Sequence, residues 1–223
     1  MMGCAPIHSL RRGDYEGSDV YQLLDQVGQV RIEHRFERPN GETVLASLCS
    51  GSVLFEDNEF SYVLTAGHCV DQRTSPQYVS STFEFAGEEG ELYVRGINLD
   101  YALLRIPNVE IEPLMIGDSS QLREGDVINA IGYPLGIIKN VSEGIVSNLS
   151  LPQEIDDTEG FMFTAAISPG SSGGPLFART GRGFELVGIA ISYYPRGNDM
   201  YCATGINQIL EDIERQGIFW LHR

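Results

Sequence analysis

Short runs of alternating polar and apolar residues, or of apolar residues alone, recur along most of this chain. Residues 29–36 alternate with a period of two, which is typical of a strand with one buried face. Runs of one kind or the other follow at residues 43–55, 60–66, 83–85, 92–94, 102–106, 127–134, 144–149, 161–167 and 186–192. We expect each of these segments to be a strand. Within the first segment we expect His34 to be a surface residue.

Only the end of the chain has a helical period. Ile206, Ile209, Leu210 and Ile213 fall on one face of a helix over residues 206–215. Many short strands with a single closing helix predict an all-β fold, either a barrel or a sandwich. Residues 107–126 mix Pro, Gly, Ser and acidic side chains, so we interpret them as the connection between two halves.

Composition and charge narrow the class of protein. The 223 residues are 42% hydrophobic and 21% charged, which fits a globular chain with one large domain or two small barrels. No run approaches the roughly twenty apolar residues of a membrane-spanning helix, so we expect no membrane span. The formal net charge of −16 argues against a nucleic-acid partner, since nucleic acid favours basic surfaces. Residues 1–10 lack a basic start and an apolar run, so we expect no signal peptide.

A loop rich in glycine and serine is the strongest candidate for chemistry. Residues 168–176 read Ser-Pro-Gly-Ser-Ser-Gly-Gly-Pro-Leu, between two apolar runs. Such a loop can present a serine oxygen while backbone N–H groups point at one spot, as acyl transfer requires. A tight turn in a β protein would have the same composition, so the loop alone does not decide between the two interpretations.

Two other residues supply the chemistry that a serine lacks. His68 ends an apolar strand in the stretch Thr-Ala-Gly-His-Cys, and Asp100 comes just before the apolar run 101–104. Alone, His68 fits a buried, hydrogen-bonded histidine, and Asp100 fits a turn at the start of a strand. Together with Ser172 they form a possible nucleophile, base and orienting acid, because a serine hydroxyl needs a base and that base needs an acid.

The order of these residues discriminates between folds. Residues 170–174 also match the G-x-S-x-G nucleophile elbow of α/β-hydrolases, whose acid and histidine follow the serine. Here only His222 follows Ser172, and strands do not alternate with helices. The order His, Asp, Ser instead matches the chymotrypsin-like arrangement.

Three stretches of this sequence resemble the signature motifs of trypsin-like serine proteases, namely residues 65–69, 99–104 and 170–175. Residues 127–149, with Ala-Ile-Gly-Tyr-Pro-Leu-Gly and Gly-Ile-Val-Ser, look more specifically like the HtrA/Deg-type branch. The resemblance covers residues 27–213. It implies two six-stranded antiparallel β-barrels with a C-terminal helix. The expected parts are an arm at 1–26, a first barrel at 27–112, a second barrel at 113–205 and a helix with its tail at 206–223.

The resemblance also implies a role for each motif residue. His68 would be the general base and then the general acid, Asp100 would orient it, and Ser172 would form an acyl-enzyme. The N–H groups of Gly170 and Ser172 would make the oxyanion hole. Ser171 is the competing nucleophile by sequence alone, but the family motif favours Ser172.

Specificity follows from the same resemblance. Ala166 would form the base of the specificity pocket, and Ile191, Ser192 and Tyr193 would supply its walls. An alanine at the base argues against cleavage after Lys or Arg and favours small or medium apolar residues.

Several features depart from the family or stay open. Digestive members have an aspartate where this chain has Ser171, so we expect no activation through a new N-terminus. HtrA/Deg-type enzymes commonly carry a PDZ domain after the protease, and we expect none in this chain. The resemblance implies a Cys49–Cys69 disulfide, whereas two reduced, buried thiols are the alternative. A disulfide would favour a secreted or periplasmic location, and its absence a cytoplasmic one. Cys4 and Cys202 have no assigned role.

The sequence therefore predicts a serine endopeptidase that acts on a protein or peptide. The alternative is a latent or inactive protease-like module that binds a peptide or partner. We expect no metal, because the cysteines and histidines lack paired ligand spacing, and no cofactor, because no phosphate-binding or dinucleotide motif is present. The oligomeric state, the natural substrate and the activating signal are not predicted.

Overall fold

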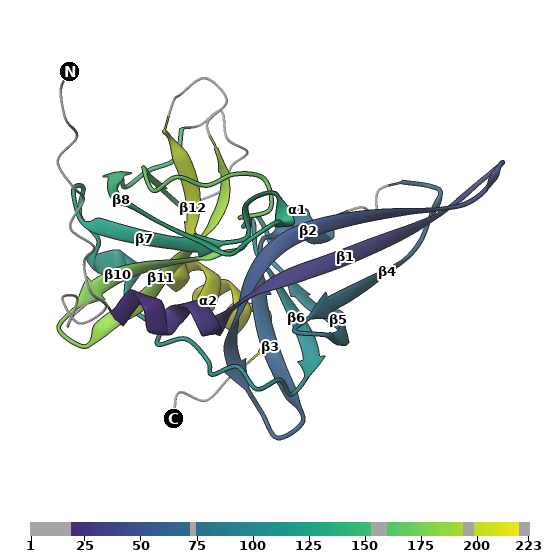
Figure 1. Ribbon diagram of the computed structural model, residues 1–223, viewed down its shortest axis with the longest axis horizontal. Helices are drawn as coiled ribbons and strands as arrows, with labels where there is room; N and C mark the ends of the chain where they lie inside the picture. Colours follow the sequence, from purple (N-terminus) through teal and green to yellow (C-terminus); the bar gives the residue numbers. More distant parts are fainter. Residues whose placement is uncertain (1–18, 72–74, 153–159, 194–198, 219–223) are drawn as a thin grey trace, which may run out of the picture.

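The computed structural model describes residues 19–71, 75–152, 160–193 and 199–218. Within these residues the chain folds into two closed six-stranded antiparallel β-barrels and a C-terminal helix (Figure 1). The predicted fold class is therefore confirmed. Residues 1–18 of the expected arm, which include Cys4, and residues 219–223 of the tail, which include His222, lie outside the described residues.

The first barrel is formed by β1 to β6, in the strand order β1-β2-β3-β6-β5-β4. A 3₁₀ helix, η1 (Asp19–Gln26), precedes it. The strands are β1 (Val27–Arg38), β2 (Gly41–Glu56), β3 (Phe60–Thr65), β4 (Tyr78–Phe85), β5 (Glu88–Arg95) and β6 (Ala102–Pro107). The hairpin of β1 and β2 extends well beyond the barrel, as the long purple ribbons of Figure 1 show.

The second barrel repeats the same topology, in the order β7-β8-β9-β12-β11-β10. Its strands are β7 (Val127–Gly132), β8 (Asn140–Asn148), β9 (Phe161–Phe163), β10 (Pro175–Thr180), β11 (Gly183–Tyr193) and β12 (Tyr201–Gly205). Helix α2 (Ile206–Arg215) follows β12 and has the bounds that its apolar period predicts. The sequence did not predict β10 or β12. β10 begins at a proline directly after the glycine pair, and β12 has only five residues, so neither shows a clear alternation.

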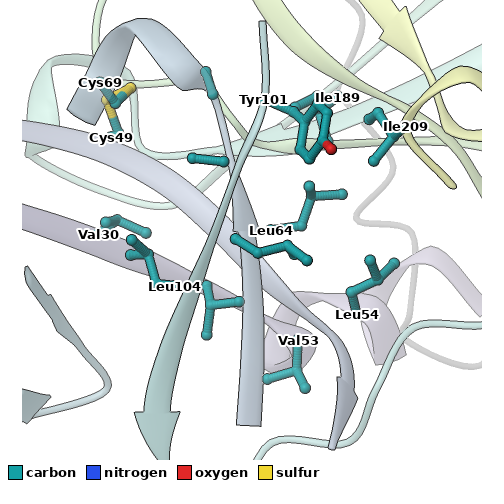
Figure 2. Close-up of a cluster of buried hydrophobic side chains, with 14 of the residues drawn as sticks. Val30, Cys49, Val53, Leu54, Leu64, Cys69, Tyr101, Leu104, Ile189 and Ile209 are labelled. Atoms are coloured by element: carbon teal, nitrogen blue, oxygen red, sulfur yellow. A yellow bond between two sulfur atoms is a disulfide. The ribbon is translucent and has the colours of Figure 1, made fainter. Parts of the chain in front are cut away.

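One hydrophobic cluster joins the two barrels. It contains residues of the first barrel, together with Ile189 of β11 and Ile209 of α2 (Figure 2). A smaller cluster fills the second barrel. Burial of apolar side chains is the main favourable contribution to folding, so the shared cluster stabilises the docking of the barrels as well as each barrel.

The expectation that His34 lies on the surface is wrong. Its side chain is only 2% exposed and shares the buried phase of β1 with Ile32 and Phe36. Its Nδ1 lies 2.7 Å from Ser81 Oγ, which also lies 3.0 Å from the hydroxyl of Tyr78. A polar side chain on the buried face of a strand is stable when it finds such partners.

Two other kinds of feature are absent from the residues that the structure describes. No helix there is long and apolar enough to cross a membrane. No group of three or more His, Cys, Asp or Glu side chains there is arranged to hold a metal ion.

Candidate active site

His68 lies in a short helical turn that directly follows a buried strand. The turn, α1 (Gly67–Val70), comes one residue after β3 ends at Thr65. Cys69 forms a disulfide with Cys49 of β2, so the predicted pairing is confirmed (Figure 2). The His68 side chain is nevertheless 48% exposed. The backbone at His68 is therefore fixed by the neighbouring disulfide, while its side chain is open to solvent.

Asp100 holds both the backbone and the ring of His68. Its Oδ1 accepts a hydrogen bond from the His68 backbone N–H at 2.7 Å, and its Oδ2 lies 2.7 Å from His68 Nδ1. Gly67 makes this close approach possible, since a Cβ there would lie 3.0 Å from Asp100 Oδ1 and from the backbone of Tyr101. The structure thus brings together two of the three predicted catalytic residues.

The pKa of His68 is raised above its ordinary value. Burial of the imidazole ring disfavours its charged form and so lowers the pKa. The hydrogen bond and negative charge of Asp100, with a smaller contribution from Asp71, raise the pKa by more than burial lowers it. An ionised carboxylate can only accept, so Nδ1 carries a proton toward Asp100 and the neutral ring keeps Nε2 as its acceptor. His68 can therefore take up a proton at Nε2.

The serine loop has a backbone conformation that requires glycine at two positions. Gly170 has φ +95° and Gly173 has φ +80°, in the left-handed region that favours glycine. A Cβ on Gly173 would lie within 2.5 Å of Thr65 and Ala66, the residues that precede α1. The loop therefore packs directly against the segment that carries His68.

The two serines of the loop have different environments. Ser171 is 4% exposed, and its Oγ accepts a hydrogen bond from the Ser168 N–H at 3.4 Å. Ser172 is half-buried, and its Oγ makes no hydrogen bond to any other described residue, including His68. Its carbonyl accepts a hydrogen bond from the Ser50 N–H at 2.8 Å. Ser50 follows Cys49, which is bonded to the neighbour of His68, so short covalent and hydrogen-bonded links connect Ser172 to the histidine.

Two peptides of the loop are held through their carbonyls, which leaves their N–H groups on the opposite side. The Pro169 carbonyl accepts from Leu135 N–H at 2.6 Å, and the Ser171 carbonyl accepts from Gly174 N–H at 2.9 Å. The N–H and C=O of a trans peptide point in opposite directions, so the N–H groups of Gly170 and Ser172 point the other way. Neither of these two N–H groups donates to another residue that the structure describes.

The residues expected to form a specificity pocket lie in different environments. Ala166 is exposed, and its carbonyl accepts from Ser142 Oγ at 2.7 Å. Ile191 packs in the shared hydrophobic cluster, whereas Ser192 is half-buried near the Cys202 thiol, whose pKa is raised by burial. The side chain of Tyr193 lies outside the described residues.

Sequence reasoning missed the contacts around Ser50. In the stretch Leu-Cys-Ser-Gly-Ser at 48–52, the sequence assigns a role only to Cys49. In the fold, Ser50 and Leu135 both hydrogen-bond to the serine loop. Only the position of Ser50 beside a bridging cysteine hints at this role, and the sequence does not predict the hydrogen bond of Leu135 to the loop.

Comparison with known proteins gives a consistent result. The family described as "Trypsin-like peptidase domain" matches residues 49–189, which is more than half of the chain. "Serine protease Do-like HtrB" of Bacillus subtilis is 32% identical over 63% of this chain. "Probable periplasmic serine endoprotease DegP-like" of Halomonas elongata is 33% identical over 82% of it. The chain spans only about a third of the length of these curated relatives, 31% and 38% respectively.

Solved structures share the fold. "HtrA-type protease AlgW with tripeptide" matches 90% of this chain and 64% of its own, with a TM-score of 0.68 and 22% identity. "Rv3671c protease, inactive form" matches 96% of this chain and 100% of its own, with a TM-score of 0.65 and 18% identity.

Proposed function

The chain belongs to the trypsin-like peptidase family, and we propose that it is a serine endopeptidase that acts through His68, Asp100 and Ser172. One observation carries the proposal. Asp100 holds His68 by two hydrogen bonds of 2.7 Å, while the loop of Ser172 packs against the segment that precedes His68. A nucleophile, its base and an orienting acid are what acyl transfer by a serine requires.

In this mechanism Ser172 Oγ attacks the carbonyl carbon of the scissile bond while His68 Nε2 takes up the hydroxyl proton. The tetrahedral adduct collapses as His68 returns that proton to the leaving amine, so the peptide bond breaks and an acyl-enzyme forms. Water then attacks the acyl-enzyme ester while His68 again acts as the base. The acyl group leaves as a carboxylic acid product, and the Ser172 hydroxyl is restored. Asp100 stabilises the imidazolium at both stages.

The negative charge on the substrate oxygen is stabilised by the N–H groups of Gly170 and Ser172. Neither N–H group donates to another residue that the structure describes, which supports this role. In comparable enzymes the loss of one such donor costs about 3 kcal/mol of transition-state stabilisation. The missing Ser172–His68 hydrogen bond is compatible with catalysis, because such contacts often shorten only when substrate binds.

The substrate is a protein or peptide, cut after a small or medium apolar residue. The family resemblance assigns Ala166 to the base of the specificity pocket, and an alanine there supports this preference because it offers no charge to a Lys or Arg side chain. The Cys49–Cys69 disulfide supports an oxidising compartment, secreted or periplasmic. The word periplasmic in the name of the Halomonas relative points the same way.

A fluorophosphonate probe, which labels activated serines, tests the proposal. We would compare the native chain with Ser172→Ala and with Ser171→Ala as the matched control. Labelling that is lost only in Ser172→Ala supports the proposed nucleophile, and loss only in Ser171→Ala overturns it.

A native chain that does not label would then be tested with added peptides. Labelling that begins with peptide supports a latent protease. A chain that stays unlabelled with every peptide is a binding module, and the proposed activity is wrong.

A further inference from the structure

Ser50 occupies a completely buried position at the boundary between the two barrels. It lies in β2 of the first barrel with 0% exposure, yet two of its contacts reach the serine loop and a third reaches Tyr133, just after β7. Its hydroxyl donates to the Gly170 carbonyl at 2.8 Å and accepts from the Tyr133 N–H at 2.8 Å. A buried hydroxyl that both donates and accepts is held in one orientation.

The backbone of Ser50 is held as firmly as its side chain. Its N–H donates to the Ser172 carbonyl at 2.8 Å, and its carbonyl accepts from Thr65 Oγ1 at 2.8 Å. Ser50 therefore contacts the serine loop at two residues, Gly170 and Ser172. These are the residues whose N–H groups form the proposed oxyanion hole.

Gly170 needs such a restraint more than other residues do. Glycine has the widest choice of backbone conformations, and Gly170 sits at φ +95°. The peptide before it is fixed by the Leu135 N–H, which donates to the Pro169 carbonyl. The peptide after it is fixed by the Ser50 hydroxyl. The N–H of that second peptide also donates within the loop, to the Ser168 carbonyl at 2.9 Å. Both peptides are thus held, and Ser50 and Leu135 supply the contacts that reach them from outside the loop.

We propose that Ser50 is a positioning residue that fixes the Gly170 N–H in the direction required by the oxyanion hole. The inference rests on the proposed function. An oxyanion hole is effective because its donors are oriented before charge develops on the substrate oxygen. Ser50 touches neither substrate nor reacting atoms, and it acts only through the Gly170 carbonyl. The first barrel thus shapes a hole built from backbone of the second.

The chain supplies a matched control two residues along the same strand. Ser52 is also 0% exposed, and among the described residues its Oγ has no hydrogen-bond partner. Ser52→Ala removes a buried hydroxyl of the same size without touching the serine loop. Any effect that is specific to Ser50→Ala therefore reports on the contacts with Gly170 and Tyr133.

The first experiment measures kinetics on a peptide substrate, well below the unfolding temperature of each variant. We expect Ser50→Ala to lower kcat by about ten- to a hundredfold, with KM changed less than about threefold, because only transition-state binding is affected. Ser52→Ala should stay within about twofold of native in both constants. Equal losses in both variants, or a loss confined to KM, would overturn the inference.

The second experiment does not depend on activity. Backbone ¹⁵N relaxation and amide hydrogen exchange are measured for Gly170 and Tyr133. We expect greater mobility at Gly170 and faster exchange at Tyr133 in Ser50→Ala, and no change in Ser52→Ala. Unchanged ¹⁵N relaxation of the Gly170 amide in Ser50→Ala would overturn the inference. If these changes occur in a chain that never reacts with the probe, the positioning contact stands and the proposed function fails.

Discussion

Asp100 binds His68 through both of its oxygens, one to the backbone N–H and one to the ring Nδ1, each at 2.7 Å. Two contacts from one carboxylate fix the position of the residue and the orientation of its ring together. The ring can therefore neither rotate nor exchange tautomers without losing a charge-assisted hydrogen bond.

Asp100→Asn should lower kcat by about four orders of magnitude, because an amide that donates to Nδ1 selects the wrong tautomer. The same change removes the charge that raises the pKa of His68, so the acid limb of the pH profile should move to lower pH. A profile of kcat/KM against pH measures both effects. Asp71→Asn is the control, with a smaller shift in the same direction. An acid limb that moved to higher pH in Asp100→Asn would contradict the assignment.

Buried His34 should make the protein less stable in acid. Burial lowers the pKa of His34, partly offset by a hydrogen bond with the Cys69 backbone, so the unfolded chain binds a proton that the folded chain refuses. Stability should therefore fall as the pH drops below about 6.5, by at most about 1.4 kcal/mol per pH unit.

Urea unfolding of His34→Gln and its parent, both in a Ser172→Ala background that prevents self-cleavage, measures this effect. The parent should lose more stability than His34→Gln between pH 7.5 and 5.5. His68 contributes with the opposite sign, since its pKa is raised, but it is common to both proteins and cancels. A difference between the two that does not vary with pH would exclude the explanation.

The buried carboxylate of Asp212 links helix α2 to the segment 97–101, which contains Asp100. It is 2% exposed and accepts from Tyr101 OH at 2.8 Å, from Ile97 N–H at 3.1 Å and from Gln216 Nε2 at 2.9 Å. Tyr101→Phe leaves this carboxylate one donor short. We expect a loss of about 1.5–3 kcal/mol in the free energy of unfolding.

Chemical denaturation compares this variant with Tyr93→Phe, whose ring is partly exposed and whose hydroxyl has no hydrogen bond to a described residue. Tyr93→Phe should stay within about 0.5 kcal/mol of native. Equal effects of the two substitutions would show that the contact with Asp212 contributes nothing specific.

The disulfide between Cys49 and Cys69 spans 20 residues, and a chain-entropy estimate for such a loop gives about 3 kcal/mol of stabilisation. The double variant Cys49→Ala/Cys69→Ala should lose roughly that amount in urea unfolding. Reductant should destabilise the native chain similarly and leave the double variant unchanged. A response of the double variant to reductant would show that the loss of stability does not come from the Cys49–Cys69 disulfide.

The sequence was most informative where short-range pattern and chemistry coincide. Helix α2 has the bounds that its apolar spacing predicts, and the motif residues His68 and Asp100 lie in contact. The pattern failed where a polar residue lies on a buried face, as at His34, because its partner Ser81 is on another strand. Ser50 and Asp212 were missed for the same reason. The partner Gly170 of Ser50 and the partner Tyr101 of Asp212 each lie more than a hundred residues away, and no local pattern encodes such pairs.

The two ends of the Ser50–Gly170 hydrogen bond lie 120 residues apart. A ribosome that adds about 5–20 residues per second needs roughly 6 to 24 s to synthesise that interval. Within this interval the growing chain gains His68 and then Asp100, but until the end of the interval it has neither the nucleophile nor the loop that would receive the Ser50 hydroxyl. Synthesis from the N-terminus thus delays the hydrolytic activity that we propose, and the nascent first barrel cannot digest the chain to which it is attached.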